Sequence, residues 1–207
     1  MNIKVIDHPL VKHYLTYLRD KTSQPELFRA ISKRLTTILV LEATRGLSIN
    51  PKAVTTPMED YAGAIIGEGI TAVPILRAGL GMLDPVLEYF PSVSVGYIGL
   101  ERDHTTAIAS TYYSKLPPNM SDRLTLILDP MLATGGSATN AINSVKAAGA
   151  RRIVMVCIIA APEGVTELNK IHPDVDIVAA GLDRELNAQK YILPGLGDYG
   201  DRLYGTE

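Results

Sequence analysis

Apolar positions along the chain follow helical and strand periods in turn, and they predict alternating elements. Residues 9–20 and 25–44 carry apolar side chains at helical spacing, and Pro9 stands where a helix can begin. Between residues 49 and 70 the pattern is mixed and punctuated by proline and glycine, which indicates short antiparallel strands or a hairpin. Residues 1–8 are compatible with a short extended arm.

Further along the chain, apolar runs that suit buried strands alternate with helical segments. The expected strands are 70–76, 93–100, 124–128, 153–160 and 175–180, and the expected helices are 79–89, 138–148 and about 165–171. Continuous apolar runs are typical of parallel strands covered on both faces. The alternation therefore predicts an α/β fold with a doubly wound parallel sheet. Pro74 argues against a fully paired central position at that point, because proline has no N–H to donate.

The stretch from Leu124 to Ser137 organises the rest of the chain. An apolar strand breaks at Asp129-Pro130, and Thr-Gly-Gly-Ser at 134–137 then opens a helix. A helix start exposes unpaired N–H groups and the positive end of the dipole, so the glycine turn predicts a phosphate cup. Asp129, at the carboxyl end of the strand, suits ribose hydroxyls or a divalent cation. Taken alone, the four residues also fit a plain tight turn with an N-cap.

Other segments carry candidate binding groups. Arg77 follows an apolar strand and precedes two glycines, so its guanidinium suits pyrophosphate, although an exposed helix-start arginine fits the same pattern. The polar stretch 103–119 is either a flap over a site or a plain surface hairpin. The glycine-dense end, 191–206, carries too much apolar surface for a frayed tail. It is predicted to be neither helix nor ordinary strand, but a packed loop whose main-chain groups meet a planar ligand.

Length, net charge and cysteine content limit the classes of binding partner and the cellular compartment that we expect. The chain has 207 residues, which suits one large domain, and a net charge of −2, which gives no reason to expect a nucleic-acid or membrane partner. The single Cys157 lies in an apolar run, so we expect a buried thiol and a cytoplasmic protein rather than a disulfide framework. His8 and His13 lack an accompanying Cys or carboxylate pattern, and we expect them to be solvated or capping.

The sequence Asp-Pro-Met-Leu-Ala-Thr-Gly-Gly-Ser at 129–137 resembles the ribose-5-phosphate loop of type I phosphoribosyltransferases, in the uracil phosphoribosyltransferase branch. The resemblance extends over nearly the full chain and rests on residues 8–13, 73–82, 129–137, 160–164 and 191–206. It implies a single phosphoribosyltransferase domain, with an N-terminal arm and helices at about 1–48, a Rossmann-like core at about 70–190, a β hood, and a uracil-binding loop at 191–207.

The resemblance also implies an activity and its participants. The family is a pentosyltransferase of pyrimidine salvage that converts uracil and phosphoribosyl pyrophosphate (PRPP) into UMP and pyrophosphate, with Mg²⁺ carried by PRPP rather than by protein ligands. Homodimers or homotetramers are implied, and GTP is an allosteric effector in some relatives. The implied catalytic residues are Arg77, Asp129 and Asp198. The implied PRPP contacts are Arg77, Arg102, Asp129, Pro130, Met131, Leu132, Ala133, Thr134, Gly135, Gly136, Ser137 and Asp198, and the implied uracil contacts are Ile192, Gly197, Asp198 and Tyr199.

Several residues differ from the pattern of type I relatives, and two alternative functions stay open. Pro130 and Ala133 stand where relatives often carry acids, so the group that deprotonates uracil is not identified. Glu101 replaces a common aromatic residue, and Tyr199 replaces a small residue in the expected base pocket. The alternatives are a phosphoribosyltransferase for another base and a PRPP-binding pyrimidine regulator that binds RNA on the same fold.

Overall fold

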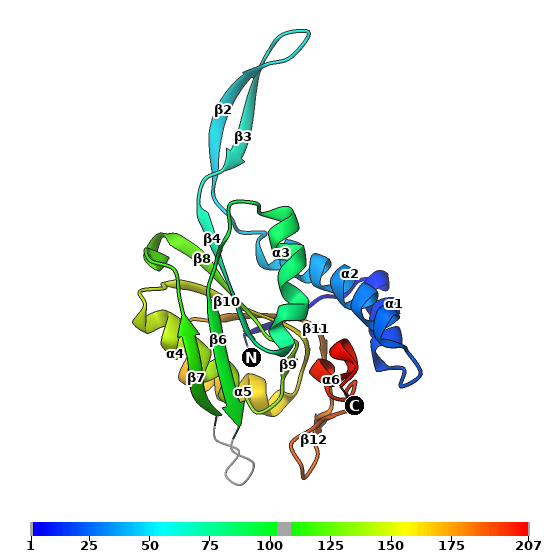
Figure 1. The fold of residues 1–207 in the computed structure, drawn as a ribbon. Coiled ribbons are helices and arrows are strands. Elements are labelled where there is room, and N and C mark those ends of the chain that lie inside the picture. The colour runs from blue at the N-terminus through cyan, green and yellow to red at the C-terminus, as the bar shows by residue number, and fades with distance from the viewer. Residues whose placement is uncertain (1, 103–108, 207) are drawn as a thin grey trace.

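The computed structural model describes residues 2–102 and 109–206, and its centre is a mostly parallel β-sheet (Figure 1). Neighbouring strands follow the order β1 (Ile3–Val5), β11 (Asp176–Leu182), β10 (Arg152–Ala160), β8 (Arg123–Leu128), β4 (Gly69–Leu76), β6 (Tyr97–Arg102) and β7 (Ala109–Lys115). Every pairing along this path is parallel except that between β6 and β7. The predicted parallel α/β fold is confirmed.

Helices cover both faces of this sheet. On one face lie α1 (Pro9–Arg19), α2 (Pro25–Ala43) and α3 (Leu83–Tyr89), and on the other lie α4 (Gly136–Ala147) and α5 (Pro162–Ile171) (Figure 1). Successive side chains of β10 point to opposite faces, as the strand period requires. Val154, Val156 and Ile158 therefore join the core under α2, whereas Met155 and Cys157 join the core under α4.

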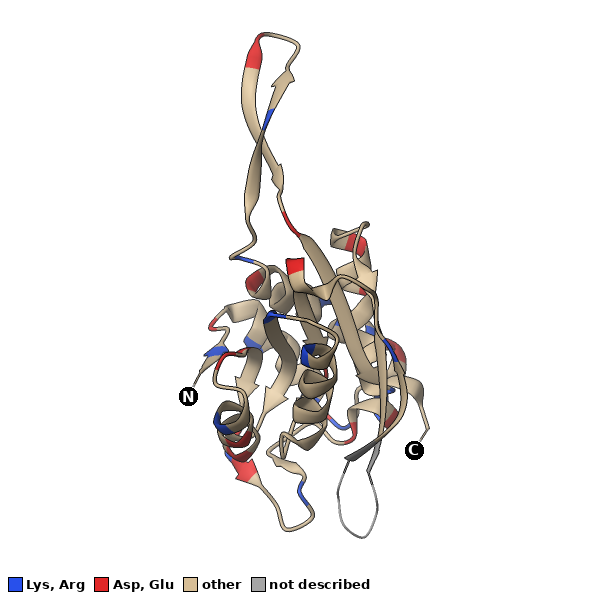
Figure 2. Cartoon of the chain, turned by 90° about the vertical axis from the view of Figure 1, so that its left-hand side faces the viewer, with Lys and Arg blue, Asp and Glu red and all other residues tan. Residues whose placement is uncertain are grey.

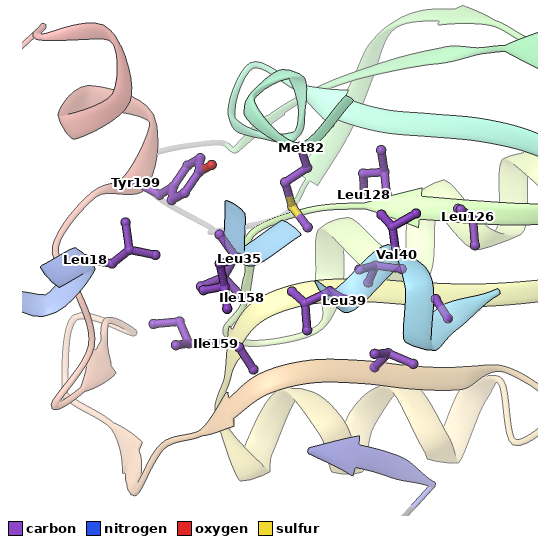
Figure 3. Packing of buried hydrophobic residues seen from close by; sticks show 14 of the residues in the cluster. Leu18, Leu35, Leu39, Val40, Met82, Leu126, Leu128, Ile158, Ile159 and Tyr199 are labelled. Atoms are coloured by element: carbon purple, nitrogen blue, oxygen red, sulfur yellow. The ribbon is translucent and has the colours of Figure 1, made fainter. Parts of the chain in front are cut away.

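The core under α2 reaches from the sheet to the C-terminal segment. Figure 3 shows Leu35 and Leu39 of α2 facing Ile158 and Ile159, with Tyr199 at the edge of the same cluster. All five side chains are almost completely removed from water. Each buried aliphatic side chain of this size contributes roughly 1.5–3 kcal/mol by transfer out of water. This packing fixes the C-terminal segment against the body of the protein.

Two expectations for the middle of the chain need correction. The segment 79–89 is not one helix, because a 3₁₀ turn, η1 (Ala78–Met82), precedes α3. The expected strand 93–100 is divided into β5 (Ser94–Val95) and β6, which continues to Arg102. β4 pairs with β5 at residues 71–72 and with β6 at 75–76, so Pro74 falls between those two pairings. The strand is central, and Pro74 itself is not paired on both sides.

The prediction that the C-terminal end is neither helix nor strand is wrong. Short strands β12 (Glu185–Leu186) and β13 (Ile192–Leu193) pair to form the β hood, and α6 (Tyr199–Tyr204) follows. The Asp198 carboxylate accepts the Asp201 N–H at the start of α6, and Gly205 ends the helix with a φ of 67°. Tyr199 and Leu203 form its buried side, so this end is packed as expected.

A two-stranded arm projects from the body. β2 (Ile49–Thr55) and β3 (Asp60–Ile66) pair with each other and extend well beyond the sheet (Figure 1). This confirms the expected hairpin. Nearly all of its residues are exposed. The arm has an acidic tip at Glu59 and Asp60 and one basic residue, Lys52, along its length (Figure 2).

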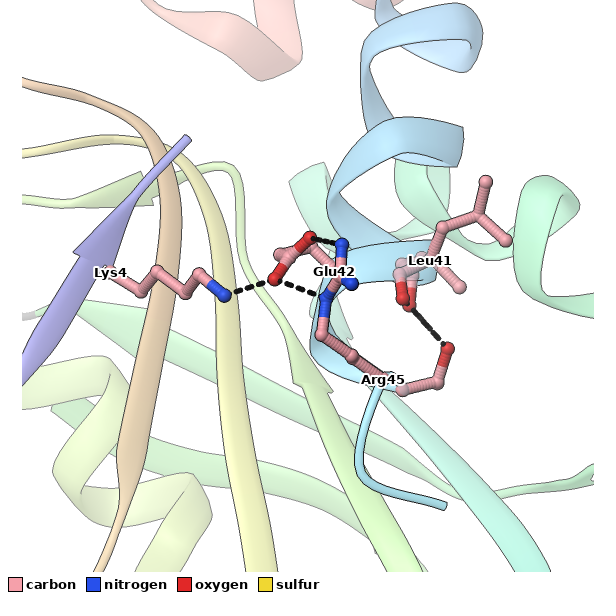
Figure 4. A network of polar contacts seen from close by, with 6 residues as sticks. Lys4, Leu41, Glu42 and Arg45 are labelled. Carbon is pink, nitrogen blue, oxygen red and sulfur yellow. Dashed lines mark hydrogen bonds and ion pairs between the residues drawn. The ribbon is translucent and has the colours of Figure 1, made fainter. Parts of the chain in front are cut away.

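The N-terminal arm is tied to the body at the opposite end of the strands from the candidate site. β1 forms the edge of the sheet beside β11, and Lys4 contacts the carboxylate of Glu42 near the end of α2 (Figure 4). Arg45 donates from Nε and Nη2 to the two oxygens of the same carboxylate, at 2.9 and 2.8 Å. The hydrogen bonds from Arg45, and then that from Lys4, lower the pKa of Glu42 to about 2.

The single cysteine and the two N-terminal histidines lie in the environments that the sequence predicts. Cys157 is fully buried, and burial together with the nearby Asp129 charge raises the pKa of its thiol. His8 caps α1, with its Nδ1 accepting the Leu10 N–H at 3.1 Å, and His13 is exposed beside Tyr17. No helix within residues 2–102 and 109–206 is both long and apolar enough to span a bilayer.

Candidate active site

A cleft of about 550 Å³ opens at the carboxyl ends of β4 and β8. The chain crosses this edge after Leu76 and after Leu128, and the hood and α6 close the cleft from the other side. The size suits a nucleotide-sized ligand, and the carboxyl edge is where open α/β sheets bind ligands. Its lining includes Arg77, Asp129, Met131, Ala133, Ser137, Ile192, Gly197, Asp198 and Tyr199.

The glycine turn lies at the start of α4, as predicted. Gly135 is the N-cap residue and has a φ of 86°, a conformation that L side chains rarely adopt. A Cβ on Gly135 would lie 3.0 Å from the Gly164 carbonyl oxygen, and one on Gly164 would lie 2.3 Å from the Ala133 oxygen. The turn is therefore seated directly on α5, which fixes its amide groups at the mouth of α4 next to Ser137.

Asp129 is the first residue after β8. Its N–H donates to the Val156 carbonyl at 3.2 Å, and its Oδ1 accepts the Met131 N–H at 3.5 Å. These bonds hold the carboxylate at the floor of the cleft, where its negative charge helps to raise the pKa of the buried Cys157 thiol. Pro130, in turn, accepts two β10 amides through its carbonyl, so the break after β8 is anchored to the neighbouring strand.

Arg77 directly follows β4 on the opposite wall. Its side chain is 63% exposed, and its Nη2 lies 3.6 Å from Asp201 Oδ1. The following turn approaches β8 so closely that a Cβ on Gly79 would lie 2.3 Å from the Leu128 carbonyl oxygen. This contact brings Arg77 and Asp129 to the same cleft. Arg102 is at the end of β6, and its side chain lies outside the described part of the structure.

The C-terminal segment supplies the third wall. Ile192 is buried in the hood, and Gly197 and Asp198 are exposed at the start of α6. The Tyr199 side chain, however, turns away from the cleft. It is 1% exposed, packs edge-on against Phe28, and shares a hydrogen bond with the Ser32 hydroxyl. Only the Tyr199 main chain is placed to border a base pocket.

Not every residue of the predicted loop faces the cleft. The side chains of Pro130 and Leu132 are buried, and the Leu132 carbonyl accepts the Ala161 N–H at 2.9 Å. Thr134, Gly135 and Gly136 stand at its rim and do not form its lining. The segment 103–108, part of the expected flap, lies outside the described residues; the strands that flank it form a β6–β7 hairpin.

Sequence reasoning missed part of the lining. Ile75, Leu76, Ala78, Leu100, Gln189, Lys190, Tyr191 and Gly200 also face the cleft. Lys190 adds a cation on the hood side, in a left-handed conformation with a φ of 67°. Nothing in its local sequence distinguishes it from an ordinary surface lysine. Asp201, which pairs with Arg77, was missed as well, although its three-residue spacing from Asp198 places both at the start of one helix.

Comparisons with known proteins show which family the chain resembles in sequence. A family model described as uracil phosphoribosyltransferase matches residues 5–206. A uracil phosphoribosyltransferase of Roseiflexus castenholzii is 52% identical over 202 residues, which cover 98% of this chain and 97% of the relative. A uracil phosphoribosyltransferase of Bacillus pumilus is 48% identical over 206 residues, 99% of each chain.

Solved structures show the same fold. The AQ2163 protein from Aquifex aeolicus superposes with a TM-score of 0.93 at 37% identity, covering 99% of both chains. An adenine phosphoribosyltransferase from Trypanosoma brucei, in complex with AMP, pyrophosphate and ribose-5-phosphate, superposes with a TM-score of 0.57 at 12% identity, covering 87% of this chain and 84% of that one. The second similarity extends to the fold alone.

Proposed function

Since the chain belongs to the uracil phosphoribosyltransferase family, we propose that the cleft at the carboxyl edge of its sheet carries out the family reaction. The enzyme is a pentosyltransferase of class EC 2.4.2.9 that converts uracil and PRPP into UMP and pyrophosphate in pyrimidine salvage. One observation carries the assignment to this cleft: the loop after Asp129, through Met131, Ala133 and Ser137, and the C-terminal loop line the same cavity although they are far apart in sequence.

The 5′-phosphate binds at the start of α4. Amides of the 134–137 turn, the Ser137 hydroxyl and the positive end of the helix dipole favour an anion there. Met131 and Ala133 border the ribose, while the Pro130 and Leu132 main chains anchor the loop to the strand beside it. Asp129 accepts hydrogen bonds from the ribose hydroxyls, since a carboxylate beside the phosphate itself would be repelled.

The pyrophosphate binds on the Arg77 side, and Arg102, the last residue of the neighbouring strand β6, is assigned to it as the family resemblance implies. The residues present fit Mg²⁺ as a partner of PRPP: Asp129 and Asp198 both line the cleft, whereas the described residues contain no group of three or more His, Cys, Asp or Glu side chains that could hold an ion alone. PRPP oxygens would carry the ion into the cleft, as the family resemblance implies. When bound, Mg²⁺ neutralises charge on the leaving pyrophosphate.

Uracil is held against the main chain of the C-terminal loop. Gly197 has a φ of 79° and no side chain, so its exposed peptide groups can approach the ring closely. Ile192 supplies an apolar contact, and the Tyr199 main chain borders the pocket. A backbone N–H that donates to uracil O4 would face the amino group of cytosine, and a carbonyl that accepts from uracil N3–H would face the unprotonated N3 of cytosine.

In the reaction the bond from ribose C1 to pyrophosphate oxygen breaks, the bond from C1 to uracil N1 forms, and the N1 proton is released. Positive charge develops on the ribose, and the carboxylates of Asp129 and Asp198 stabilise it. Arg77 stabilises the negative charge on the departing pyrophosphate. Holding N1 opposite C1 supplies much of the acceleration. The group that accepts the proton is not assigned.

We also propose that the protein forms a homodimer or homotetramer through its β2–β3 arm. A hairpin with no cover is marginally stable in water. One face of this arm is apolar at its consecutive cross-strand pairs, Ile49–Ile66, Pro51–Ala64 and Ala53–Ala62. A second copy of the chain offers the same patch, so a two-fold contact covers both arms at once.

The deciding experiment measures UMP formation from labelled uracil and PRPP with Mg²⁺, across a panel of uracil, cytosine, orotate, hypoxanthine and xanthine. We expect uracil to be preferred over cytosine by about 10⁴–10⁵ in kcat/KM, because cytosine would leave polar groups mismatched. Equal use of both bases would contradict the assignment of the loop. Parallel reactions with GTP test the effector that the family resemblance implies.

A pyrimidine regulator that binds RNA is the second candidate. Among the residues that the structure describes, Lys and Arg are interspersed with Asp and Glu rather than gathered in one stripe (Figure 2), which gives no electrostatic footprint for RNA. Binding of RNA at moderate salt, together with absence of UMP formation, would favour the regulator. A cytoplasmic location, proposed from the reduced and buried Cys157, suits either function.

A further inference from the structure

The last helix contacts Arg77 in two places. Asp201 Oδ1 lies 3.6 Å from Arg77 Nη2, and the Tyr204 hydroxyl donates to the Arg77 carbonyl oxygen at 3.4 Å. Both the guanidinium and the main chain of Arg77 are thus held by α6. Because α6 begins at Asp198, the same short helix joins the proposed base loop to the proposed pyrophosphate arginine.

Asp201 is itself held in place. The Thr206 hydroxyl donates to Asp201 Oδ1 at 2.6 Å, and the Asp201 N–H donates to the Asp198 carboxylate at 3.0 Å. Arg29 of α2 donates to the Leu203 carbonyl at 2.8 Å, which anchors the helix to the body. The Asp201 carboxylate is therefore a fixed negative charge beside a long, otherwise adaptable side chain.

The exposure of the pair indicates what it does. The Arg77 side chain is 63% exposed and that of Asp201 is 34% exposed, so water screens their attraction and the pair adds little to folding stability. Its effect is expected instead on the direction in which the guanidinium points. A guanidinium carries five N–H donors in a planar fork, so a contact at Nη2 leaves donors for pyrophosphate oxygens.

We propose that Asp201 is a positioning residue for PRPP, which restricts the Arg77 guanidinium at the edge of the cleft before the substrate arrives. Ordering a free arginine opposes binding through its lost rotamer freedom. A guanidinium already held by Asp201 loses less freedom when pyrophosphate binds. This inference rests on the proposed function, in which Arg77 binds the pyrophosphate of PRPP.

The first test is Asp201→Asn, which removes the charge while keeping the size of the side chain and an oxygen that can accept from Thr206. We expect KM for PRPP to rise about two- to fivefold, in line with an exposed ion pair, while KM for uracil stays within twofold. Asp201→Glu should recover part of the loss. Glu88→Gln is the matched control, because it removes another exposed carboxylate, 3.0 Å from Lys33 and outside the cleft lining.

A double-mutant cycle separates positioning from a general structural role. In an Arg77→Ala background, where PRPP use is already weakened, Asp201→Asn should change kcat/KM for PRPP by less than about 1.5-fold, because the contact it removes is gone. An undiminished effect in that background, or a lower KM for PRPP in the single variant, would overturn the proposal. Failure of the proposed function is distinguishable, since the wild-type protein would then form no UMP from uracil and PRPP.

Discussion

Tyr199 borders the cleft at its main chain, whereas its side chain lies in the core. Its neighbours Gly197 and Asp198 border the cleft, yet its own ring lies in the core, 5.3 Å from the Phe28 ring and tilted by 62°. Its hydroxyl is bonded to the buried Ser32 hydroxyl, and burial raises the pKa of the phenol. Tyr199 therefore joins α6 to α2. Its presence where relatives commonly carry a small residue changes the packing of the core rather than the contacts with the nucleobase.

Tyr199→Phe should lower the free energy of unfolding by about 1–3 kcal/mol, because the buried Ser32 hydroxyl loses its partner. Chemical denaturation at constant m-value measures the change. Tyr61→Phe, on the exposed arm, is the control and should stay within about 0.5 kcal/mol of the wild type. Indistinguishable denaturation midpoints for Tyr199→Phe and the wild type would show that the bond does not contribute.

At the scale of elements, the start of α4 combines two demands on Gly135. The residue has a positive φ, and a Cβ there would also press on the Gly164 carbonyl oxygen of α5. A left-handed conformation costs an L residue roughly 1–2 kcal/mol. Contact between a new Cβ and the Gly164 carbonyl oxygen would in addition displace the turn that carries the proposed phosphate-binding amides.

Gly135→Ala should therefore raise KM for PRPP by about tenfold or more, with a smaller effect on KM for uracil, because displaced amides bind phosphate less well. Steady-state kinetics with each substrate varied in turn measures the difference. Gly149→Ala is a matched control: Gly149 has a φ of +98° at the other end of α4, and no atom lies within 4 Å of the Cβ position. It should lose comparable stability and keep both KM values. Equal kinetic effects in the two variants would contradict the role of the turn.

The elements with a clear apolar period could be predicted from sequence alone. The strand predicted at 153–160 and the helices predicted from Pro9 and Pro25 begin and end within one residue of the observed elements, because burial on one or both faces selects the pattern directly. The C-terminal helix α6 was not predicted, because it is only six residues long and the glycines around it favoured a loop. Tyr199 and Leu203, four residues apart, form its buried side, and Asp198 caps it.

At the scale of the whole molecule, the sequence motifs predicted which segments meet at the cleft but not how they are held. The tertiary links are single contacts with no periodic signature, such as Asp201 with Arg77, Gly79 against Leu128, and the anchoring of the turn on Gly164. Each of these contacts joins residues at least 29 positions apart in the sequence. Two of them also require a glycine, because a Cβ at that position would collide with a carbonyl oxygen. Patterns of local burial cannot show them, because the partner lies on another element.

The projecting arm is a large feature whose exposed apolar surface the monomer does not explain. Its register places Ala53, Ala62 and Ala64 on one face with Ile49 and Ile66, and places Lys52 on the other. The two isoleucines are 69% and 49% exposed, which is unusual for adjacent apolar side chains in a protein with a well-formed core. A contact between two arms would remove this surface from water.

Ala64→Glu should convert the proposed oligomer to a monomer. A two-fold contact brings the new carboxylate close to its copy or buries it without a partner, and such like-charge or unpaired arrangements cost several kcal/mol, so the dissociation constant should rise by about 100-fold or more. Size-exclusion chromatography with light scattering across a dilution series measures the mass. Lys52→Glu, which also adds negative charge but on the opposite face of the same arm, should keep the wild-type mass. A wild-type monomer at all concentrations, or an Ala64→Glu variant with unchanged mass, would show that the apolar face of the arm is not where the copies meet.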